Sequence, residues 1–165
     1  MNKFWTTTVL ASALFAGLQT TVYALEKGAI EVKSIAEVEI KAKNAKGVME
    51  TKREPVTLAT PGTVVIYTTS FRNVSTKPAG GISIVNPIDK NVGLVAGSVF
   101  GDNTDVTYSV DAGKTYAAAD KIIVKTAEGR ERPALPSDFN SIRWQYKGDL
   151  APNKVGEVGF RAVIK

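Results

Sequence analysis

The stretch of sequence that decides the fold lies at residues 61–73 and is Pro-Gly-Thr-Val-Val-Ile-Tyr-Thr-Thr-Ser-Phe-Arg-Asn. Its Pro-Gly pair predicts a turn, because proline has a fixed φ and glycine adopts positive φ without a steric cost. In the strand that follows, every second residue from Val65 to Phe71 falls on one face. Val64 and Ile66 make the opposite face apolar as well, so we expect this strand near the centre of a sheet.

The same period of two recurs along the chain, in segments that are separated by turn residues. It is clearest at residues 30–42, 82–88, 106–110, 121–126, 142–146 and 158–164, with a return strand at 48–60 and a short strand within 92–100. Residues 132–139 contain two prolines and are predicted to be irregular. Because no helical period appears after residue 24, we predict an all-β antiparallel sandwich. The predicted core residues are Tyr67, Phe71, Trp144 and Phe160.

Residues 1–24 have the composition of a helical secretory signal peptide. Lys3 is their one charge, residues 6–18 are uncharged, and Val22-Tyr23-Ala24 supplies small residues for cleavage after Ala24. A transmembrane anchor is the alternative, but the apolar core at 9–18 is shorter than the roughly 20 residues that a bilayer requires. We therefore expect a periplasmic or extracellular protein that is not inserted in the membrane after the signal is removed.

Composition argues against most catalytic chemistry. The chain has no histidine and no cysteine, so it lacks the commonest general base, the usual zinc ligands and a thiol nucleophile. A Ser-Lys dyad or a catalytic carboxylate pair is an alternative, but no motif marks either one. The sequence therefore favours a protein that is not an enzyme and needs no cofactor.

The net charge of +5 is spread along the chain, and no basic run is interleaved with aromatic residues. This pattern predicts no nucleic-acid partner. A mild attraction to anionic glycans or lipopolysaccharide is an alternative to a plain solvated surface.

The segment at residues 28–43 alternates apolar and charged residues for longer than an ordinary strand. This arm either folds back onto its own domain or acts as a donor strand for a neighbouring subunit. The expected organisation is a signal peptide at 1–24, an arm and hairpin at 25–55, and a sandwich at 56–165, with 25–165 forming one compact domain.

An ordered set of motifs links these turns and strands to a known family. The motif residues are Pro61, Gly62, Val65, Tyr67, Phe71, Asn73, Asn86, Pro87, Ile142, Trp144, Leu150, Ala151, Pro152, Val158 and Phe160. Over about residues 56–165 they resemble the "conserved repeat" immunoglobulin-like domain of bacterial secreted and surface proteins, the domain of unknown function eleven family. The resemblance implies an immunoglobulin-like sandwich. Family members often carry tandem copies and a wall anchor, whereas this chain has one copy, so the role of a wall-bound adhesin is not carried over.

Residues 109–116 resemble the Asp-box hairpin of sialidase-type propellers. Asp111 is expected to accept hydrogen bonds from the turn, Gly113 to adopt positive φ, and Tyr116 to pack beneath. A propeller needs several copies of this motif, and the chain has one, so we predict a well-made hairpin without a propeller.

Two further patterns suggest sites without defining them. Asp102, Asn103 and Asp105 are weak candidates for calcium ligands, against the alternative of a solvated turn, because the full loop pattern of an EF-hand is missing. Asn73 and Asn86 could form isopeptide crosslinks with lysines such as Lys33 or Lys41, or they could cap strand ends.

The sequence leaves two functions open. The first is a structural or interaction module of the cell envelope, which binds other envelope proteins or a second copy of itself through strand edges. The second is a soluble glycan- or ligand-binding module, which requires exposed aromatic side chains. Phe100, Tyr108 and Phe139 are the candidates for this aromatic platform.

Overall fold

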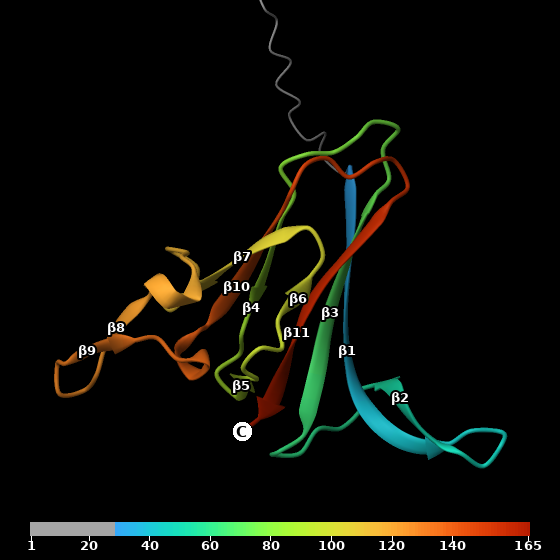
Figure 1. The fold of residues 1–165 in the computed structure, drawn as a ribbon, viewed down its shortest axis with the longest axis horizontal. Helices are drawn as coiled ribbons and strands as arrows, with labels where there is room; N and C mark the ends of the chain where they lie inside the picture. Colours follow the sequence, from blue (N-terminus) through green and yellow to red (C-terminus); the bar gives the residue numbers. More distant parts are fainter. Residues whose placement is uncertain (1–28) are drawn as a thin grey trace, which may run out of the picture.

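Two antiparallel sheets pack as an immunoglobulin-like sandwich in the computed structural model, which describes residues 29–165 (Figure 1). The larger sheet has the order β2-β1-β3-β11-β5, with β6 also paired to β11, and the smaller sheet has the order β4-β10-β7. Strands β8 and β9 form a separate ribbon. The strands are β1 Ile30–Lys43, β2 Met49–Pro55, β3 Val64–Asn73, β4 Ser83–Pro87, β5 Val92–Leu94, β6 Phe100–Gly101, β7 Thr104–Ser109, β8 Ile123–Lys125, β9 Glu131–Pro133, β10 Ser141–Tyr146 and β11 Val155–Ile164. The predicted all-β sandwich is confirmed, and the predicted signal peptide lies outside the described residues.

Strand β3 lies in the interior of the larger sheet, between β1 and β11. Val65 and Ile66 project to opposite faces, and each is only 1% exposed. The prediction that this strand is central, made from its two apolar faces, is confirmed.

The hydrophobic core fills the space between the two sheets. Trp144 on β10 is fully buried, and its ring stacks on that of Phe160 on β11, with centroids 6.4 Å apart. The indole Nε1 donates a hydrogen bond of 3.0 Å to the carbonyl of Phe100, which satisfies the one polar group of this side chain. Full burial of each such side chain contributes roughly 1.5–3 kcal/mol. Phe71 is buried as predicted, whereas Tyr67 is half-buried and stacks on Phe160 at 5.1 Å.

The predicted exposure of Phe139 is wrong. Its side chain is 7% exposed and stacks on Tyr108, with ring centroids 4.5 Å apart. Phe139 follows a short 3-10 helix, Pro136–Asp138, which turns the chain so that the ring points into the core. Two members of the predicted aromatic platform are therefore engaged with each other.

The segment predicted to be irregular, residues 132–139, is partly ordered. Strand β9 pairs with β8 in the register Ile123 with Pro133, so Pro133 stands at the end of a short ribbon that lacks further strands. Strand β8 is shorter than predicted, because Ala119–Lys121 form a 3-10 helix before it. No strand forms at residues 116–118, where Ala117 makes an isolated bridge to Tyr108.

The arm folds back onto its own domain. Strand β1 pairs with β3 from Ile30 to Val38 and with β2 from Glu37 to Lys43. The turn at residues 44–47 joins β1 to β2, and the Asn44 side chain accepts hydrogen bonds from the backbone N–H groups of Lys46 and Val48. The first half of the arm is thus part of the sandwich, and only the second half projects from it.

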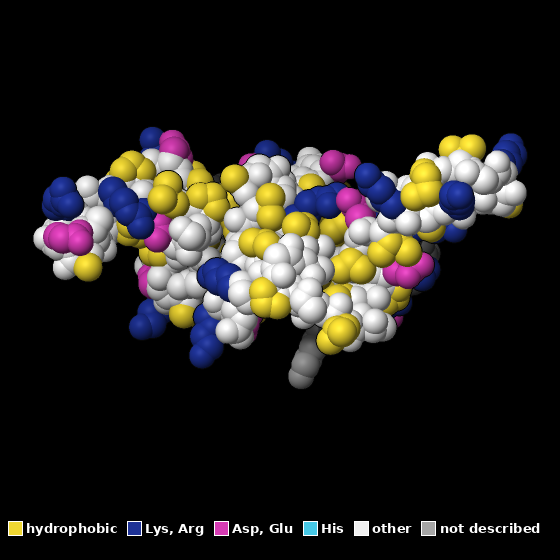
Figure 2. All heavy atoms as spheres, turned by 90° about the horizontal axis from the view of Figure 1, so that it is seen from below, with side chains coloured by type: hydrophobic (Ala, Val, Ile, Leu, Met, Phe, Trp, Pro, Cys, Tyr) yellow, Lys and Arg dark blue, Asp and Glu magenta, His cyan; other side chains and the backbone are white. Residues whose placement is uncertain are grey.

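Two hairpins project at opposite ends of the long axis, β1–β2 at one end and β8–β9 at the other (Figure 1). Seen from below, both ends carry Lys, Arg, Asp and Glu side chains, while hydrophobic atoms are scattered over the face between them (Figure 2). Within residues 29–165, no helix has the length and apolar character needed to cross a membrane.

Candidate functional site

The first half of β1 is an open edge of the larger sheet. The carbonyl of Ala36 accepts a hydrogen bond of 3.0 Å from the N–H of Val56. The backbone groups of Ala36 therefore point away from β3 and toward β2. Backbone direction alternates along a strand, and Ile30, Val32 and Ser34 therefore point the same way. Strand β2 reaches only as far as the pair of Glu37 with Pro55. None of the described strands pairs with β1 on this side between Ile30 and Ile35.

The side chains along this edge are exposed on both faces. Val32 is 52% exposed on the face that continues toward the second sheet, and Ile35 is 43% exposed on the outer face. Glu31 and Lys33 flank Val32 and are also exposed on the outer face. An exposed edge with apolar residues is a surface onto which another strand can be added.

A polar chain holds this edge strand in place. The hydroxyls of Ser34 on β1 and Thr69 on β3 lie 2.9 Å apart, and the Asn86 side chain on β4 donates to Thr69 Oγ1 at 3.1 Å. The three groups connect the edge, the middle of the larger sheet and the smaller sheet. The edge is therefore presented on a rigid support, which lowers the entropy cost of binding.

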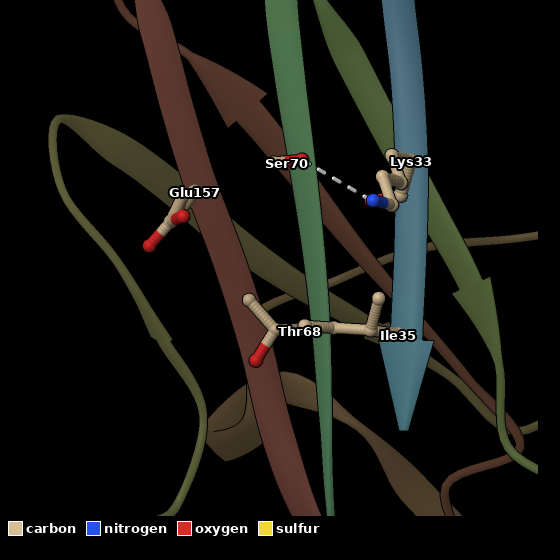
Figure 3. A pocket seen from close by; sticks show the side chains of 5 residues that line it. All are labelled: Lys33, Ile35, Thr68, Ser70 and Glu157. Atoms are coloured by element: carbon tan, nitrogen blue, oxygen red, sulfur yellow. Dashed lines mark hydrogen bonds between the residues drawn. The ribbon is translucent and has the colours of Figure 1, made fainter. Parts of the chain in front are cut away.

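A small hollow of about 150 Å³ lies on the outer face beside the edge (Figure 3). It is lined by Lys33, Ile35, Thr68, Ser70 and Glu157, which come from β1, β3 and β11. Ser70 Oγ donates to the carbonyl of Lys33 at 3.4 Å, and the buried hydroxyl of Thr68 has no hydrogen-bond partner among the described residues. The hollow suits the end of one side chain rather than a separate small ligand.

One carboxylate fastens the projecting β1–β2 hairpin to the sandwich. Glu39 Oε1 lies 2.7 Å from Arg161 Nη2 on β11 and 3.7 Å from Arg53 Nε on β2. The hydrogen bond from Arg161 holds the pKa of Glu39 below its ordinary value, and the same contact raises the pKa of Arg161. These contacts fix the direction in which the hairpin leaves the sheet.

The Asp-box motif forms the hairpin that was predicted for it. Asp111 accepts hydrogen bonds from the Thr115 hydroxyl and N–H and from the Ser109 hydroxyl, at 2.6, 2.9 and 2.7 Å. These donors, the Thr115 hydroxyl first, keep the pKa of Asp111 well below its usual range. Gly113 has φ of +83°, and a Cβ there would lie 2.9 Å from the Tyr116 hydroxyl, so Tyr116 packs beneath the turn.

A larger hollow, of about 630 Å³, lies between this hairpin and the outer face of the smaller sheet. The guanidinium of Arg143 stacks over the ring of Tyr116 at 4.4 Å, and the Tyr116 hydroxyl lies 2.8 Å from that of Ser141. Asn140 anchors the hairpin by accepting the N–H of Ala112. The hollow therefore holds a positive charge that is fixed over an aromatic ring.

The weak candidates for metal ligands lie in and beside the tight turn between β6 and β7. Asp105 pairs with Lys147 at 2.7 Å, and Asn103 donates to the carbonyl of Lys147 at 2.8 Å with φ of +56°. In residues 29–165 there is no group of three or more acidic, histidine or cysteine side chains placed to hold a metal ion. The structure thus places Asp102 and Asn103 in the turn, with Asn103 in a hydrogen bond and Asp105 in an ion pair.

The two candidate asparagines are both engaged by other groups. Asn73 is fully buried, its amide nitrogen donates to two carbonyls, and its amide oxygen accepts two hydrogen bonds from Ser75. Lys33 lies on the outer face of the sheet, whereas Asn73 lies on the inner face. Of the two predicted roles for Asn73, the structure favours the cap at the strand end over an isopeptide crosslink to Lys33.

Sequence reasoning missed both the open edge and the larger hollow. The alternating charges of the arm marked it as a strand, but its free side depends on where β2 ends. Arg143 and Tyr116 are far apart in the sequence and have no common motif. The spacing of Glu31 and Lys33 around Val32 is the one local signal that marks the edge.

No family model, curated protein or solved structure matches this chain.

Proposed function

We propose that this chain is an exported, non-enzymatic interaction module of the bacterial cell envelope, which binds through the open edge of β1. The observation that carries the proposal is the row of backbone groups at Ile30, Val32 and Ser34 with no strand beside it in the described part of the chain. The resemblance to the conserved-repeat domain and the signal-like sequence at 1–24 support export. The absence of histidine and cysteine from the sequence supports a role without catalysis.

The binding mode is strand addition. A partner strand forms main-chain hydrogen bonds with the edge, and the exposed Val32, Ile35 and the small hollow select its side chains. The charges at Glu31 and Lys33 discourage indiscriminate pairing and favour a partner with a complementary pattern. Other envelope proteins and a second copy of this chain are the expected partners.

Photo-crosslinking in the native host tests the proposal. A photo-reactive amino acid at Glu31 is expected to give crosslinked envelope protein, whereas the same group at Lys121, which is exposed far from the edge, is not. The substitution Val32→Pro removes an N–H that faces the open side, so it should abolish the crosslinks without unfolding the domain. Crosslinks of equal strength from both positions, or crosslinks that survive Val32→Pro, would contradict edge binding.

Export has its own test. Mass spectrometry of the protein recovered from the host is expected to find a mature chain that begins at Leu25, in the periplasmic or extracellular fraction. Recovery of a chain that retains residues 1–24 in the cytoplasm would overturn this part of the proposal.

A second candidate function is ligand binding at the larger hollow, which the stacked pair of Arg143 and Tyr116 favours. A guanidinium held over an aromatic ring suits an anionic sugar, since the cation is fixed in place by the ring and pairs with the carboxylate of the sugar. An array of anionic glycans is expected to show binding that Arg143→Gln removes and the exposed control Arg130→Gln does not. An array without bound glycans would remove this candidate.

A further inference from the structure

We infer that a second copy of this chain occupies the open edge, through antiparallel pairing of the two β1 strands about a twofold axis at Val32. The inference rests on the proposed edge binding and adds the identity of the partner and the register. In this arrangement Val32 lies opposite Val32, and Glu31 of each copy lies opposite Lys33 of the other. The two larger sheets join into one continuous sheet through an isologous contact.

Backbone direction restricts the allowed registers. Ile30, Val32 and Ser34 point their N–H and C=O groups toward the open side, while Glu31, Lys33 and Ile35 point theirs toward β3. Antiparallel strands form hydrogen-bonded pairs only between residues that both point toward the shared side. A twofold axis must therefore pass through a residue of β1 and cannot pass between two residues.

Charge then selects one register from those that remain. An axis at Glu31 would place two Glu31 carboxylates opposite each other, and an axis at Lys33 would do the same with two ammonium groups. An axis at Ser34 would oppose Glu31 to Glu37. Only the axis at Val32 pairs both charges with their opposites, and directly opposed charges of like sign destabilise a sheet while unlike charges stabilise it.

The position of β2 supports the same centre. The carbonyl of Ala36 is already bonded to Val56, so the open part of the edge ends at Ile35. The segment from Ile30 to Ser34, which the proposed axis bisects, lies within this open part. Val32, which is 52% exposed in the single copy, would be covered by its symmetry mate.

Sedimentation equilibrium on the mature chain, from micromolar to millimolar concentration, is the first test. A reversible dimer is expected, and Val32→Pro should make the protein monomeric. Because the Val32 N–H faces the open side, this proline removes no hydrogen bond to β3. Circular dichroism and thermal unfolding of the Val32→Pro variant show whether the fold is retained. Val74→Pro would be unsuitable as a variant, because the N–H of Val74 donates a hydrogen bond to the carbonyl of Ala29.

Charge reversal tests the register. The single variants Glu31→Lys and Lys33→Glu each place like charges opposite each other twice, so each is expected to weaken dimerisation on the order of tenfold. The double variant E31K/K33E restores both pairs, and an equimolar mixture of the two single variants restores them between unlike copies. Both should therefore dimerise about as well as the unaltered chain.

The mixing experiment separates the effect of each substitution on dimerisation from its effect on the stability of a single chain. Glu31 also lies opposite Arg72 of its own chain, so Glu31→Lys alone can lower the stability of the monomer. Recovery of association on mixing cannot come from that local effect, because neither chain is altered by mixing. Dimers that are insensitive to single reversal, or a mixture no tighter than its components, would overturn the register.

The outcomes also distinguish this inference from the proposed function. A chain that stays monomeric up to millimolar concentration overturns self-pairing. If its Glu31 crosslinks to other envelope proteins still disappear with Val32→Pro, edge binding stands with a different partner. If both dimerisation and edge-specific crosslinks are absent, the proposed function fails as well.

Discussion

Asn73 ties three chain segments together at the end of the sandwich. Its amide nitrogen donates to the carbonyls of Lys77 and Leu150, each at 2.7 Å, and its amide oxygen accepts the N–H and hydroxyl of Ser75. All four hydrogen bonds of a buried carboxamide are thus satisfied. The end of β3, the loop after it and the turn before β11 are held together at one point.

The substitution Asn73→Ala is expected to lower the free energy of unfolding by about 2–4 kcal/mol, because buried carbonyls lose their donor and a small cavity forms. Urea denaturation measures this change. Asn91→Ala is the matched control, since Asn91 is exposed and should cost within about 0.5 kcal/mol. Equal effects of the two substitutions would contradict the role assigned to Asn73.

Gly156 shows how a residue without a side chain can shape the core. A Cβ at this position would overlap the ring of Phe71, which lies directly across the sheet. The backbone φ of Gly156 is not positive, so the position does not require the conformational freedom of glycine. Glycine is needed here because there is no space for a side chain. The ring of Phe71 can therefore lie flat over β11.

The substitution Gly156→Ala is expected to destabilise the protein by about 1–3 kcal/mol through overpacking. Gly93→Ala is the control, because a Cβ there would make only ordinary contacts, the nearest at 3.4 Å. In the background Phe71→Leu the cost of Gly156→Ala should fall, and thermal unfolding of the four proteins gives this coupling. Strict additivity would show that the ring is not the obstacle.

At the scale of elements, the β1–β2 hairpin depends on a few contacts at its base. The edge strand is supported by β3, but beyond Val38 the hairpin leaves β3 and pairs only with itself. Glu39 is the residue that connects the projecting part to β11, through Arg161. The direction of the hairpin is consequently sensitive to the charge of one carboxylate.

Glu39→Gln is expected to increase hydrogen exchange in β2 while leaving β3 unchanged, and Glu54→Gln is the exposed control. The pKa of Glu39 in the folded protein lies below its ordinary value of 4.5. Its contribution is therefore present above that value and is lost as the pH falls through the folded pKa. After correction for the intrinsic pH dependence of amide exchange, protection in β2 should fall on acidification below about 4.5 in the unaltered protein and respond less in Glu39→Gln. An equal response in the two proteins would argue against this contact.

At the scale of the whole molecule, the arm and the sandwich share the larger sheet and are expected to unfold together. The sequence predicted one compact domain over residues 25–165, and the first half of β1 is a strand of the larger sheet. Hydrogen bonds through Ser34, Thr69 and Asn86 then connect that strand to the smaller sheet. A single core of this size is expected to unfold in one step.

Urea unfolding of the mature chain should give coincident transitions by two probes. Trp144 fluorescence reports on the fully buried core, and Trp5 is removed with the predicted signal peptide. Far-ultraviolet circular dichroism reports on all strands, including β1 and β2. An earlier transition in the circular dichroism signal would show that the arm unfolds independently.

The sequence predicted the fold well because its signals are local. Alternation at Val65–Phe71 and at Ile142–Tyr146 depends only on neighbours along the chain, and so do the turns at Asn44 and Gly113. The prediction was wrong for Phe139, which is buried by the path of the short helix before it. The larger hollow has no local signature, because it joins segments that are distant in sequence, and the open edge has only the spacing of Glu31 and Lys33 around Val32.

Local chemistry along the chain thus accounts for the all-β class, the central strand, the main core residues and the turn positions, because side-chain alternation and backbone preferences act over a few residues. Long-range pairing accounts for the rest. That β1 returns to β3, that β2 stops at Pro55 and that Ile30–Ile35 keeps an open side follow from how distant strands compete for hydrogen bonds and burial. A strand edge is free only where no other strand lies beside it. Because this depends on where distant segments of the chain lie, no single stretch of sequence determines it.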